Sequence, residues 1–489
     1  MASSQIKNQH LLWRAGFGPA VEQLQDLVKY TPQEYYKALV KASAGEPRYI
    51  NIASDDLLQL YESYLAPGKR GRLTADDRRI LNRKQQAAVK DLNLYWLKEM
   101  IASSGQLREK MAYFWHGHFA CRNRNLFYNQ LFLHTLRKNA LGDFRVLLKE
   151  VSQSAAMLYF LNNQQNKKGH PNENFAREVM ELFTLGRGNY TENDIKEGAR
   201  AFTGWTANPR GAFVFNKRQH DDGVKNFLGK KGNFDGNDIL DIILEKRHTA
   251  TFITEKIYRF FVNDEVDKDR VQALSEAFYK DYDIGKLMER IFTSDWFYDE
   301  KHIGARIKSP IELLAGIQRM VPMRLDNDNA LMNLQRILGQ QLLYPPNVAG
   351  WPGGRSWIDS STLMMRLRIP QLFNDKDQMN VKPKQDDDVM MGQKTDGMAN
   401  IPAKQKAKPA KPVAGAGLIN AKIDWPQYVD KFEKVKREAI FSTISNYLFQ
   451  VNAARVDTVA TKYIDSDNRD AYIRSVTIQL MSTPEYQLC

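Results

Sequence analysis

The sequence predicts a mainly α-helical protein: one large helical domain with a small β-hairpin or loop excursion and a disordered insertion. Apolar residues recur at helical spacing along most of the chain, and capping residues stand where several helices should begin. A segment near residue 400 has little to bury. With 489 residues, 43% of them hydrophobic and 26% charged, the chain can form a large core.

The predicted main domain spans residues 1–373, with the β excursion at about 213–236. In the excursion, apolar and polar residues alternate between glycines, which is typical of short strands. Residues 374–418 are rich in Asp, Lys, Gln, Pro, Ala and Gly, which predicts a disordered linker. Residues 419–489 regain helical periodicity, and we expect these helices to pack back on the main domain.

Three helix starts are marked by a Ser or Thr that precedes an acidic residue by three positions. These pairs are Thr74 and Asp77, Thr191 and Asp194, and Ser309 and Glu312. Such side chains accept hydrogen bonds from backbone N–H groups that have no partner inside the helix. We therefore expect a helix to begin at each pair.

The net charge of +13 is concentrated in two stretches, at residues 69–90 and 404–411. We interpret the first as a solvated helix face and the second as part of the linker. No helix-turn-helix, zinc-finger or aromatic RNA-binding motif accompanies the charge, so nucleic-acid binding is a minor hypothesis.

Several motifs and segments that are absent from the sequence limit the cellular location and the class of protein. No stretch reaches the about 18 uninterrupted apolar residues of a membrane span. The start has no secretory signal, which predicts a cytoplasmic protein as written, or an envelope or exported one if the start is truncated. Cys121 and Cys489 are the only cysteines, too few for a disulfide framework. The serine-hydrolase elbow, Walker loop, dinucleotide fingerprint and HExxH motif are also absent.

The most informative residue is Glu178. Pro171 and Gly186 mark the ends of a predicted helix, and Glu178 projects into its apolar face, whereas Glu173 and Glu181 fall toward its polar side. A buried carboxylate needs a partner or a proton.

Two interpretations of Glu178 stay open. One is an ion pair that fixes helix packing, with Arg145, Arg177 or Arg200 as neighbours. The other is a general acid or base, or a metal ligand together with His118.

His118 lies on the apolar face of a second predicted helix, in LREKMAYFWHGHFA. His116 points elsewhere, so the two cannot bind one metal within a regular helix. A buried histidine with a backbone or carboxylate partner is the commoner case, and catalysis or metal binding is the alternative.

Three further groups are candidate sites, each with a plain structural alternative. Asn172, Glu173, Asn174 and Arg177 could bind a ligand or could form a solvated helix start.

His220, Asp221 and Asp222 could bind a metal or shuttle a proton, or could form a simple turn. In the proline- and glycine-rich loop LLYPPNVAGWPGGRSWIDSS, Trp351 and Trp357 could stack on a sugar ring or an apolar ligand beside Arg355. The alternative is that both tryptophans hold this loop on the helical core.

Several motifs occur in one order: LLWRAGFGP, FWHGHF, ALGDFRVLL, PNENFAREVMELFTLGRGNYTENDIKEGARAFTGW, the His-Asp pair, RIKSPIELL and PPNVAGWPGG. Together they resemble the bacterial family catalogued as domain of unknown function 1800, from about Leu11 to Arg366 and again in the closing LMSTPEYQ.

The resemblance implies a mostly helical bacterial protein, often exported and often encoded beside a partner that resembles sulfatases and alkaline phosphatases. It carries over no activity. The family motifs map onto His118 and Phe119, Asn172 to Asn174, Arg177, Glu178, Glu181, Gly204, Trp205, His220, Asp221 and Pro345 to Gly354. This chain departs from the family pattern with Asn162 in place of Asp and Gly117 in place of Asn.

Two function classes follow. The first is a hydrolase, metal-assisted or not, that acts on an anionic or glycan-like substrate, with Glu178 as general acid or base and His118 as its partner. His220 and Asp221 would close this site, so we expect the four side chains to converge in one pocket. The second is a non-catalytic binding or scaffold protein that works with the sulfatase- or phosphatase-like partner. The sequence assigns no cofactor and no metal.

Overall fold

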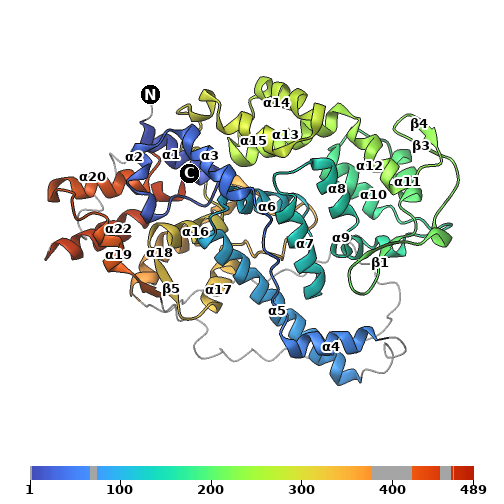
Figure 1. Cartoon of the computed structure of the whole chain (residues 1–489), viewed down its shortest axis with the longest axis horizontal. Helices are drawn as coiled ribbons and strands as arrows, with labels where there is room; N and C mark the ends of the chain where they lie inside the picture. The colour runs from blue at the N-terminus through green and yellow to red at the C-terminus, as the bar shows by residue number, and fades with distance from the viewer. Residues whose placement is uncertain (1–2, 67–73, 376–420, 452–463, 466) are drawn as a thin grey trace.

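The computed structural model describes residues 3–66, 74–375, 421–451, 464–465 and 467–489. Within these residues the protein is mainly helical with three two-stranded sheets, which confirms the predicted fold class. Figure 1 shows the N-terminal and C-terminal helices together on one side, α10 to α12 on the other, and α6 and α7 between them. The predicted linker from residue 376 onward and the lysines between 404 and 411 lie outside the described residues.

Helices account for most of the first half of the chain. They are α1 (Ser4–Arg14), α2 (Asp26–Lys29), α3 (Pro32–Ser43), α4 (Asp55–Leu65), α5 (Ala75–Ala102), α6 (Gln106–His118), α7 (Leu126–Lys138), α8 (Phe144–Ser152), α9 (Ala155–Phe160), α10 (Asn174–Glu178), the π-helix η3 (Val179–Thr184) and α11 (Glu192–Ala201).

The second half continues the helical pattern. It contains α12 (Gly236–Leu244), α13 (Arg247–Phe261), α14 (Lys268–Asp281), α15 (Ile284–Phe292), α16 (Pro310–Met320), α17 (Asn329–Ile337), α18 (Ser360–Asp375), α19 (Trp425–Asp430), α20 (Arg437–Leu448) and α22 (Arg469–Met481). Short 3₁₀ turns are η1 (Val21–Gln23), η2 (Asn163–Gln165), η4 (Lys217–Gln219), η5 (Asp295–Tyr298), η6 (Gly354–Trp357) and η8 (Glu485–Gln487).

All three predicted helix starts are confirmed. Thr74, Thr191 and Ser309 are the N-caps of α5, α11 and α16, and each forms a capping box with the acidic residue three positions later. Local hydrogen bonds of this kind depend on few residues, so the sequence reveals them directly.

The β excursion is present but begins earlier than predicted. β1 (Trp205–Ala207) pairs antiparallel with β2 (Phe213–Phe215), and β3 (Lys225–Phe227) with β4 (Lys230–Gly232). Gly204 redirects the chain from α11 into β1 with a φ of 79°, and a Cβ there would lie 2.5 Å from the Asn216 carbonyl. Only glycine fits this close approach, so the turn is fixed before the predicted boundary.

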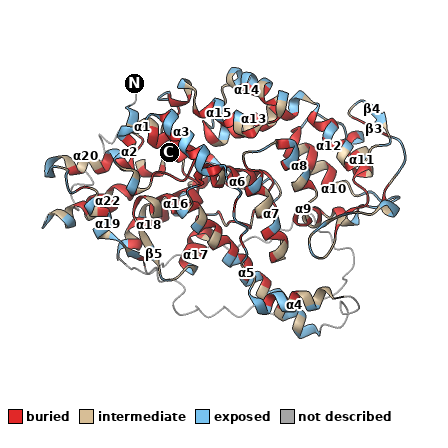
Figure 2. Cartoon of the chain, viewed as in Figure 1, coloured by how far each residue is buried: buried red, intermediate tan, exposed pale blue. Residues whose placement is uncertain are grey.

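Helix α6 lies at the centre of the molecule. Figure 2 shows buried residues along α6, α7 and α16 and mainly exposed or intermediate residues along α4. Besides its predicted apolar face, α6 buries Glu109, which pairs with Arg137, and Lys110, which pairs with Glu312. Charged residues are therefore tolerated inside this helix because each has an oppositely charged partner.

The described part of the basic stretch between residues 69 and 90 lies on α5, where Arg78, Arg79 and Arg83 are exposed. This exposure agrees with the interpretation as a solvated helix face. Lys69, Arg70 and Arg72 lie outside the described residues.

The C-terminal segment contacts the first helix. The Gln9 side-chain amide donates to the carbonyls of Asn446 and Tyr447, and the Arg14 guanidinium donates to the Cys489 carbonyl at 2.8 Å. In addition, β5 (Met323–Leu325) pairs with β6 (Ala421–Ile423). In Figure 1 the C-terminus lies beside α1, the first helix of the chain. Among the helices that the structure describes, none has both the length and the apolar character needed to cross a membrane.

Candidate functional site

The predicted helix around Glu178 begins later than expected. It starts at Asn174, and Pro171 lies in the preceding loop. The reason is local: the Asn172 N–H donates to the Asn166 side chain, and the Asn174 N–H donates to the Asn172 side chain. These side chains hold a turn in place of a first helical turn. Gly186, with a φ of 75°, marks the predicted helix end.

The helix widens into a π-helix directly after Glu178. The Leu185 N–H donates to the Met180 carbonyl, five residues earlier, at 2.8 Å. The Thr184 hydroxyl donates to the Val179 carbonyl at 2.6 Å. Single π-turns inside helices are rare and occur frequently at functional sites.

Side chains from two other helices hold this π-turn. Lys256 of α13 donates to the Leu182 carbonyl at 3.3 Å, and the His118 Nε2 of α6 lies 3.1 Å from the Phe183 carbonyl. Because these carbonyls have no intrahelical donor at the helix end, the two contacts stabilise the widened turn.

Glu178 is half-buried at the junction of the α- and π-segments. Within the described residues its carboxylate has no hydrogen bond or ion pair, so the predicted partnership with Arg145, Arg177 or Arg200 is not formed as a direct contact. Burial raises the pKa of Glu178, and the nearby charge of Glu181 raises it further.

Glu181, one turn later, has the opposite shift. Burial alone would raise its pKa, but hydrogen bonds from the Tyr190 hydroxyl, at 2.7 Å, and from Arg187 outweigh burial and lower it. Glu178 therefore holds its proton more tightly than an ordinary glutamate, and Glu181 holds its proton less tightly.

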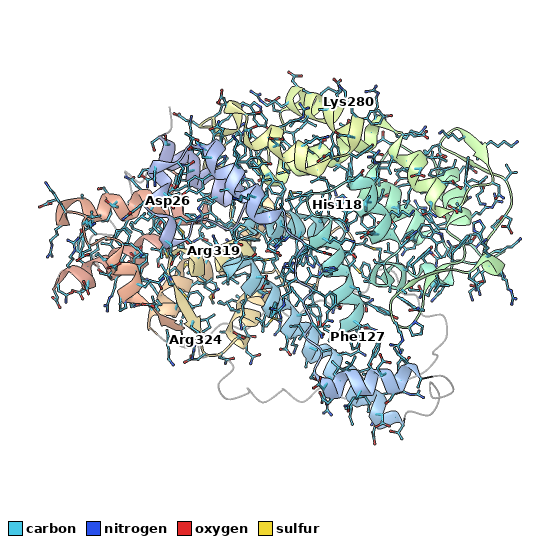
Figure 3. All side chains as sticks on the ribbon, viewed as in Figure 1. Asp26, His118, Phe127, Lys280, Arg319 and Arg324 are labelled. Carbon is cyan, nitrogen blue, oxygen red and sulfur yellow. The ribbon has the colours of Figure 1, made fainter. Side chains whose placement is uncertain are left out.

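His118 lies in an aromatic environment near the centre of the molecule (Figure 3). Its ring lies 4.5 Å from that of Phe119, and Phe114, Trp115 and Phe183 surround it. Burial lowers its pKa well below the ordinary value, and the charge of Lys256 lowers it further, so the imidazole is neutral. Nε2–H therefore donates to the Phe183 carbonyl, a backbone partner of the kind that the structural interpretation expected. Nδ1 is buried and has no hydrogen-bond partner among the residues that the structure describes.

His220 and Asp221 are engaged in contacts that hold their loop. The His220 Nδ1 lies 3.0 Å from the Thr203 carbonyl. Asp221 accepts from both Nε and Nη2 of Arg200 and from the Gly223 N–H, and these contacts lower its pKa to about 2 although burial opposes the shift. This arrangement matches the structural alternative, a turn fixed by its own polar residues.

The polar residues at the start of α10 are held by contacts with one another and with neighbouring segments. Arg177 forms two hydrogen bonds with Glu192, at 2.8 and 2.9 Å, and a longer ion pair with Glu173. The Asn174 amide donates to the Leu161 carbonyl. Asn172 and Glu173 are partly exposed beside them, so this group is a hydrogen-bonded helix start at the surface.

The loop that carries the tryptophans is attached to the opposite side of α6. The Leu343 N–H donates to the His116 Nε2 at 3.2 Å, and the Trp351 ring stacks on the His116 ring at 5.3 Å. Trp357 is buried, and Arg355 is exposed. His116 and His118 thus point to different neighbours, as predicted.

Gly117 and Asn162 stand where the resemblance to the family implies Asn and Asp. A Cβ at Gly117 would meet open space, so its lack of a side chain relieves no clash. Asn162 has a φ of 58°, in the left-handed region that Asn tolerates better than most residues.

No hydrogen bond, ion pair or ring contact joins any two of His118, Glu178, His220 and Asp221 in the part of the chain that the structure describes. Among the same residues, no group of three or more His, Cys, Asp or Glu side chains is arranged to hold a metal ion. A pocket of about 410 Å³ opens beyond the π-helix, lined by Leu185, Asn189, Thr191, Asn193, Asp194, Asn226, Leu228, Gly229, Lys246 and His248. Convergence of the four residues in one pocket stays a prediction.

The chain matches the model of the family described as protein of unknown function (DUF1800) over residues 10–488. The match covers nearly the whole chain. The protein belongs to the DUF1800 family. No curated protein and no solved structure matched this sequence.

In this DUF1800 protein, three features of the helix that carries Glu178 and of its contacts were not predicted from the sequence. The π-helix was not expected, Glu181 was placed on the solvated face, and Lys256 was not considered. Glu181 lies inside the family motif, which was the available signal. Lys256 had none, because its role depends on contact with a carbonyl 74 residues away in sequence.

Proposed function

We propose that this protein is a hydrolase of an anionic or glycan-like substrate, in which Glu178 is the general acid and Glu181 the ionised second carboxylate. One observation carries the proposal: two glutamates one helical turn apart have different surroundings. Glu178 is half-buried and has no hydrogen bond among the described residues, whereas Glu181 accepts from Tyr190 and Arg187, and these surroundings shift their pKa values in opposite directions. Paired carboxylates whose environments separate their pKa values are the acid–base pattern of glycoside hydrolysis.

In this reaction Glu178 donates its proton to the leaving-group oxygen while the bond between that oxygen and the substrate carbon breaks. Water adds to the carbon and returns a proton to Glu178, so one water is consumed and the acid is restored. Glu181 stays ionised and stabilises the positive charge that develops on the substrate.

The surroundings favour a substrate that carries negative charge. The charges of Arg177 and Arg187 limit the rise in the pKa of Glu178 that burial causes. The Arg187 side chain is largely exposed. Arg187 donates to Glu181 through Nε, and its remaining N–H groups can pair with an anionic group of the substrate. His118 and Lys256 are positioning residues here, because they hold the π-turn and do not touch the reacting atoms.

Hydrolysis of nitrophenyl glycosides, phosphate esters and sulfate esters tests the proposal. We expect at least one nitrophenyl glycoside to be cleaved, and Glu178→Gln and Glu181→Gln each to lower kcat by about 10²–10⁴-fold. Glu255→Gln is the matched control and should retain activity, because Glu255 pairs with Arg259 on the exposed side of α13 and has no part in the proposed site. Cleavage that survives Glu178→Gln would overturn the proposal, as would failure of the wild type to cleave any glycoside.

A second readout needs no substrate. Carbon-13 NMR of labelled glutamate carboxyls, assigned with the same two variants, should show Glu178 titrating at higher pH than Glu181. The opposite order would contradict the assignment of acid and partner.

A non-catalytic binding or scaffold protein is the second candidate. It is favoured because His118, Asp221 and Arg177 are all engaged in internal contacts. On this alternative no substrate is cleaved, and mixing the protein with a sulfatase- or phosphatase-like enzyme changes that enzyme's activity or sedimentation.

A further inference from the structure

The pocket of about 410 Å³ beyond the π-helix has no part in the acid–base chemistry described above. It lies where the β3–β4 hairpin meets α11 and the connection from α12 to α13, and Figure 1 shows this hairpin beside α11 and α12. Leu185, which directly follows the π-helix, forms part of its wall. Tyr190 donates to Glu181 at 2.7 Å, and the residues on both sides of Tyr190 line the pocket. The pocket is therefore connected through Tyr190 to the second carboxylate of the proposed active site.

One wall of this pocket is a hairpin turn with an uncommon backbone conformation. Leu228 has a φ of 47°, in the left-handed region that a bulky side chain rarely adopts. Asp194 accepts from the Leu228 N–H at 2.7 Å, and Lys246 donates to the Leu228 carbonyl at 3.0 Å. Strained conformations persist only where surrounding contacts impose them, and they are concentrated at ligand-binding and catalytic sites. Two charged side chains thus hold this wall in place.

The charges that line the pocket balance each other. Asp194 and Lys246 are the only permanently charged residues of the lining, and their charges are opposite. The second carboxylate oxygen of Asp194 accepts from the Thr191 N–H and hydroxyl, at 2.8 and 2.7 Å, so both of its oxygens are occupied. Because neither sign of charge is in excess, the pocket favours an uncharged ligand.

Neutral polar side chains supply the free hydrogen-bonding groups of the pocket. Among the described residues, the side chains of Asn193, Asn226 and His248 form no hydrogen bond, and all three residues are exposed. Asn189 donates from its amide to the Leu185 carbonyl at 2.9 Å and keeps its Oδ1 for another partner. A side-chain amide offers donors and an acceptor, and a sugar hydroxyl group is likewise both donor and acceptor. The lining therefore matches a ligand that is rich in hydroxyl groups.

We propose that this pocket binds an uncharged sugar unit of a glycan. The four neutral polar side chains that hold it are Asn189, Asn193, Asn226 and His248. Leu185 and Leu228 offer apolar surface to the C–H groups of the sugar ring, and the volume lies within the range of about 300–1,000 Å³ of small-molecule sites. That this sugar belongs to the hydrolysed substrate rests on the proposed function, whereas its binding does not. Arg187 then pairs with an anionic group elsewhere on the same glycan.

Saturation-transfer NMR with the full-length Glu178→Gln protein tests the binding where hydrolysis is suppressed. The uncharged probes are the methyl glycosides of glucose, galactose, mannose and N-acetylglucosamine, and the methyl glycoside of glucuronic acid is the charged counterpart. We expect at least one uncharged probe to bind with a Kd on the order of 1 mM, and the glucuronide to bind more weakly. Binding of no uncharged probe, or of the glucuronide alone, would overturn the proposal.

Variants show whether the pocket is responsible for this binding. Asn193→Ala and Asn226→Ala replace exposed side chains, so each protein should fold, and each change should raise the Kd by about 3–10-fold. The matched control is Asn233→Ala, because Asn233 is exposed directly after β4 and does not line the pocket. Unchanged binding by the folded double variant would contradict the proposal, as would an equal loss in Asn233→Ala.

The outcomes separate this proposal from the proposed function. If an uncharged probe binds and the double variant loses it, while the wild type cleaves no glycoside, the sugar site stands and the hydrolase assignment is wrong. If the wild type cleaves a glycoside but no uncharged probe binds through this pocket, the hydrolase assignment stands and the sugar site is wrong.

Discussion

Replacing Glu312 by Gln removes one charge of a buried ion pair and changes the side-chain shape little. Glu312 and Lys110 are each 1% exposed. The second carboxylate oxygen of Glu312 accepts from the Ser309 N–H at 2.8 Å, a contact that Gln can keep. Lys110 would keep its bond to the Trp13 carbonyl at 3.0 Å but would lose its carboxylate.

Two independent arguments give similar values for the loss of stability caused by Glu312→Gln. Removing one partner of a buried ion pair destabilises a protein by about 3–5 kcal/mol. Burial opposes ionisation of Glu312, but Lys110 and then Arg306 outweigh it and lower the pKa from 4.5 to about 2. At about 1.4 kcal/mol per pH unit, that gap corresponds to about 3 kcal/mol.

The sign of the pH dependence follows from the lowered pKa. Because the folded protein holds the Glu312 proton less tightly than the unfolded chain, the stabilisation is complete above pH 4.5 and is lost as pH falls toward about 2. Glu312→Gln should therefore lower stability at pH 7 and make it less sensitive to acid.

Urea unfolding followed by tryptophan fluorescence, at pH 7 and at steps down to pH 3, measures both effects. Adding Lys110→Met to Glu312→Gln removes both charges, so the double variant should be less destabilised than the sum of the single changes. Asp328→Asn is the surface control. Asp328 is 38% exposed and its partner Lys98 is 54% exposed, so this change should lower the free energy of unfolding by less than about 1 kcal/mol. A loss below about 1 kcal/mol for Glu312→Gln, or an unchanged acid response, would refute the reasoning.

Three further predictions concern single positions. Gly350→Ala should destabilise by at least about 1 kcal/mol in urea, because φ is 81° and a Cβ would lie 2.4 Å from the Gly117 carbonyl; Gly353→Ala, with open space, should change little. Cys121 should not react with Ellman's reagent until the protein is unfolded, because it is buried and burial raises its thiol pKa; rapid native reaction would contradict this. Glu178→Gln should leave the stability at pH 7 unchanged or raise it. Because the pKa of Glu178 is higher in the folded protein than in the unfolded chain, the wild type loses stability as pH rises through that pKa. The urea midpoint of the variant should therefore fall less than that of the wild type between pH 4 and pH 7.

The features that the sequence revealed depend on neighbouring residues. The capping boxes at Thr74, Thr191 and Ser309 form between positions three apart, so the pattern is visible in the sequence itself. Helical periodicity likewise predicted α6 and the separation of His116 from His118. In both cases the interaction that decides the structure is local or follows from a regular repeat.

The features that could not be predicted from the sequence depend on contacts with residues outside the helix that carries Glu178. The π-turn departs from regular helical spacing where side chains of α6 and α13 reach the carbonyls of Leu182 and Phe183. Glu181 looked like a solvated residue, and its contacts with Tyr190 and Arg187 form only once the chain turns after the helix. Periodicity could identify Glu178 but not the second carboxylate that shifts its pKa.

The contact between Arg14 and the Cys489 carbonyl also determines when the protein can finish folding. The two residues are 475 positions apart, and Lys308 and Arg306 form backbone hydrogen bonds with the same final segment. Contacts of such long range are slow to form, because a large loop must close before they contribute. The first helix therefore gains these contacts only after residues 486–489 have come close to it, and we expect refolding of the chain to be slow.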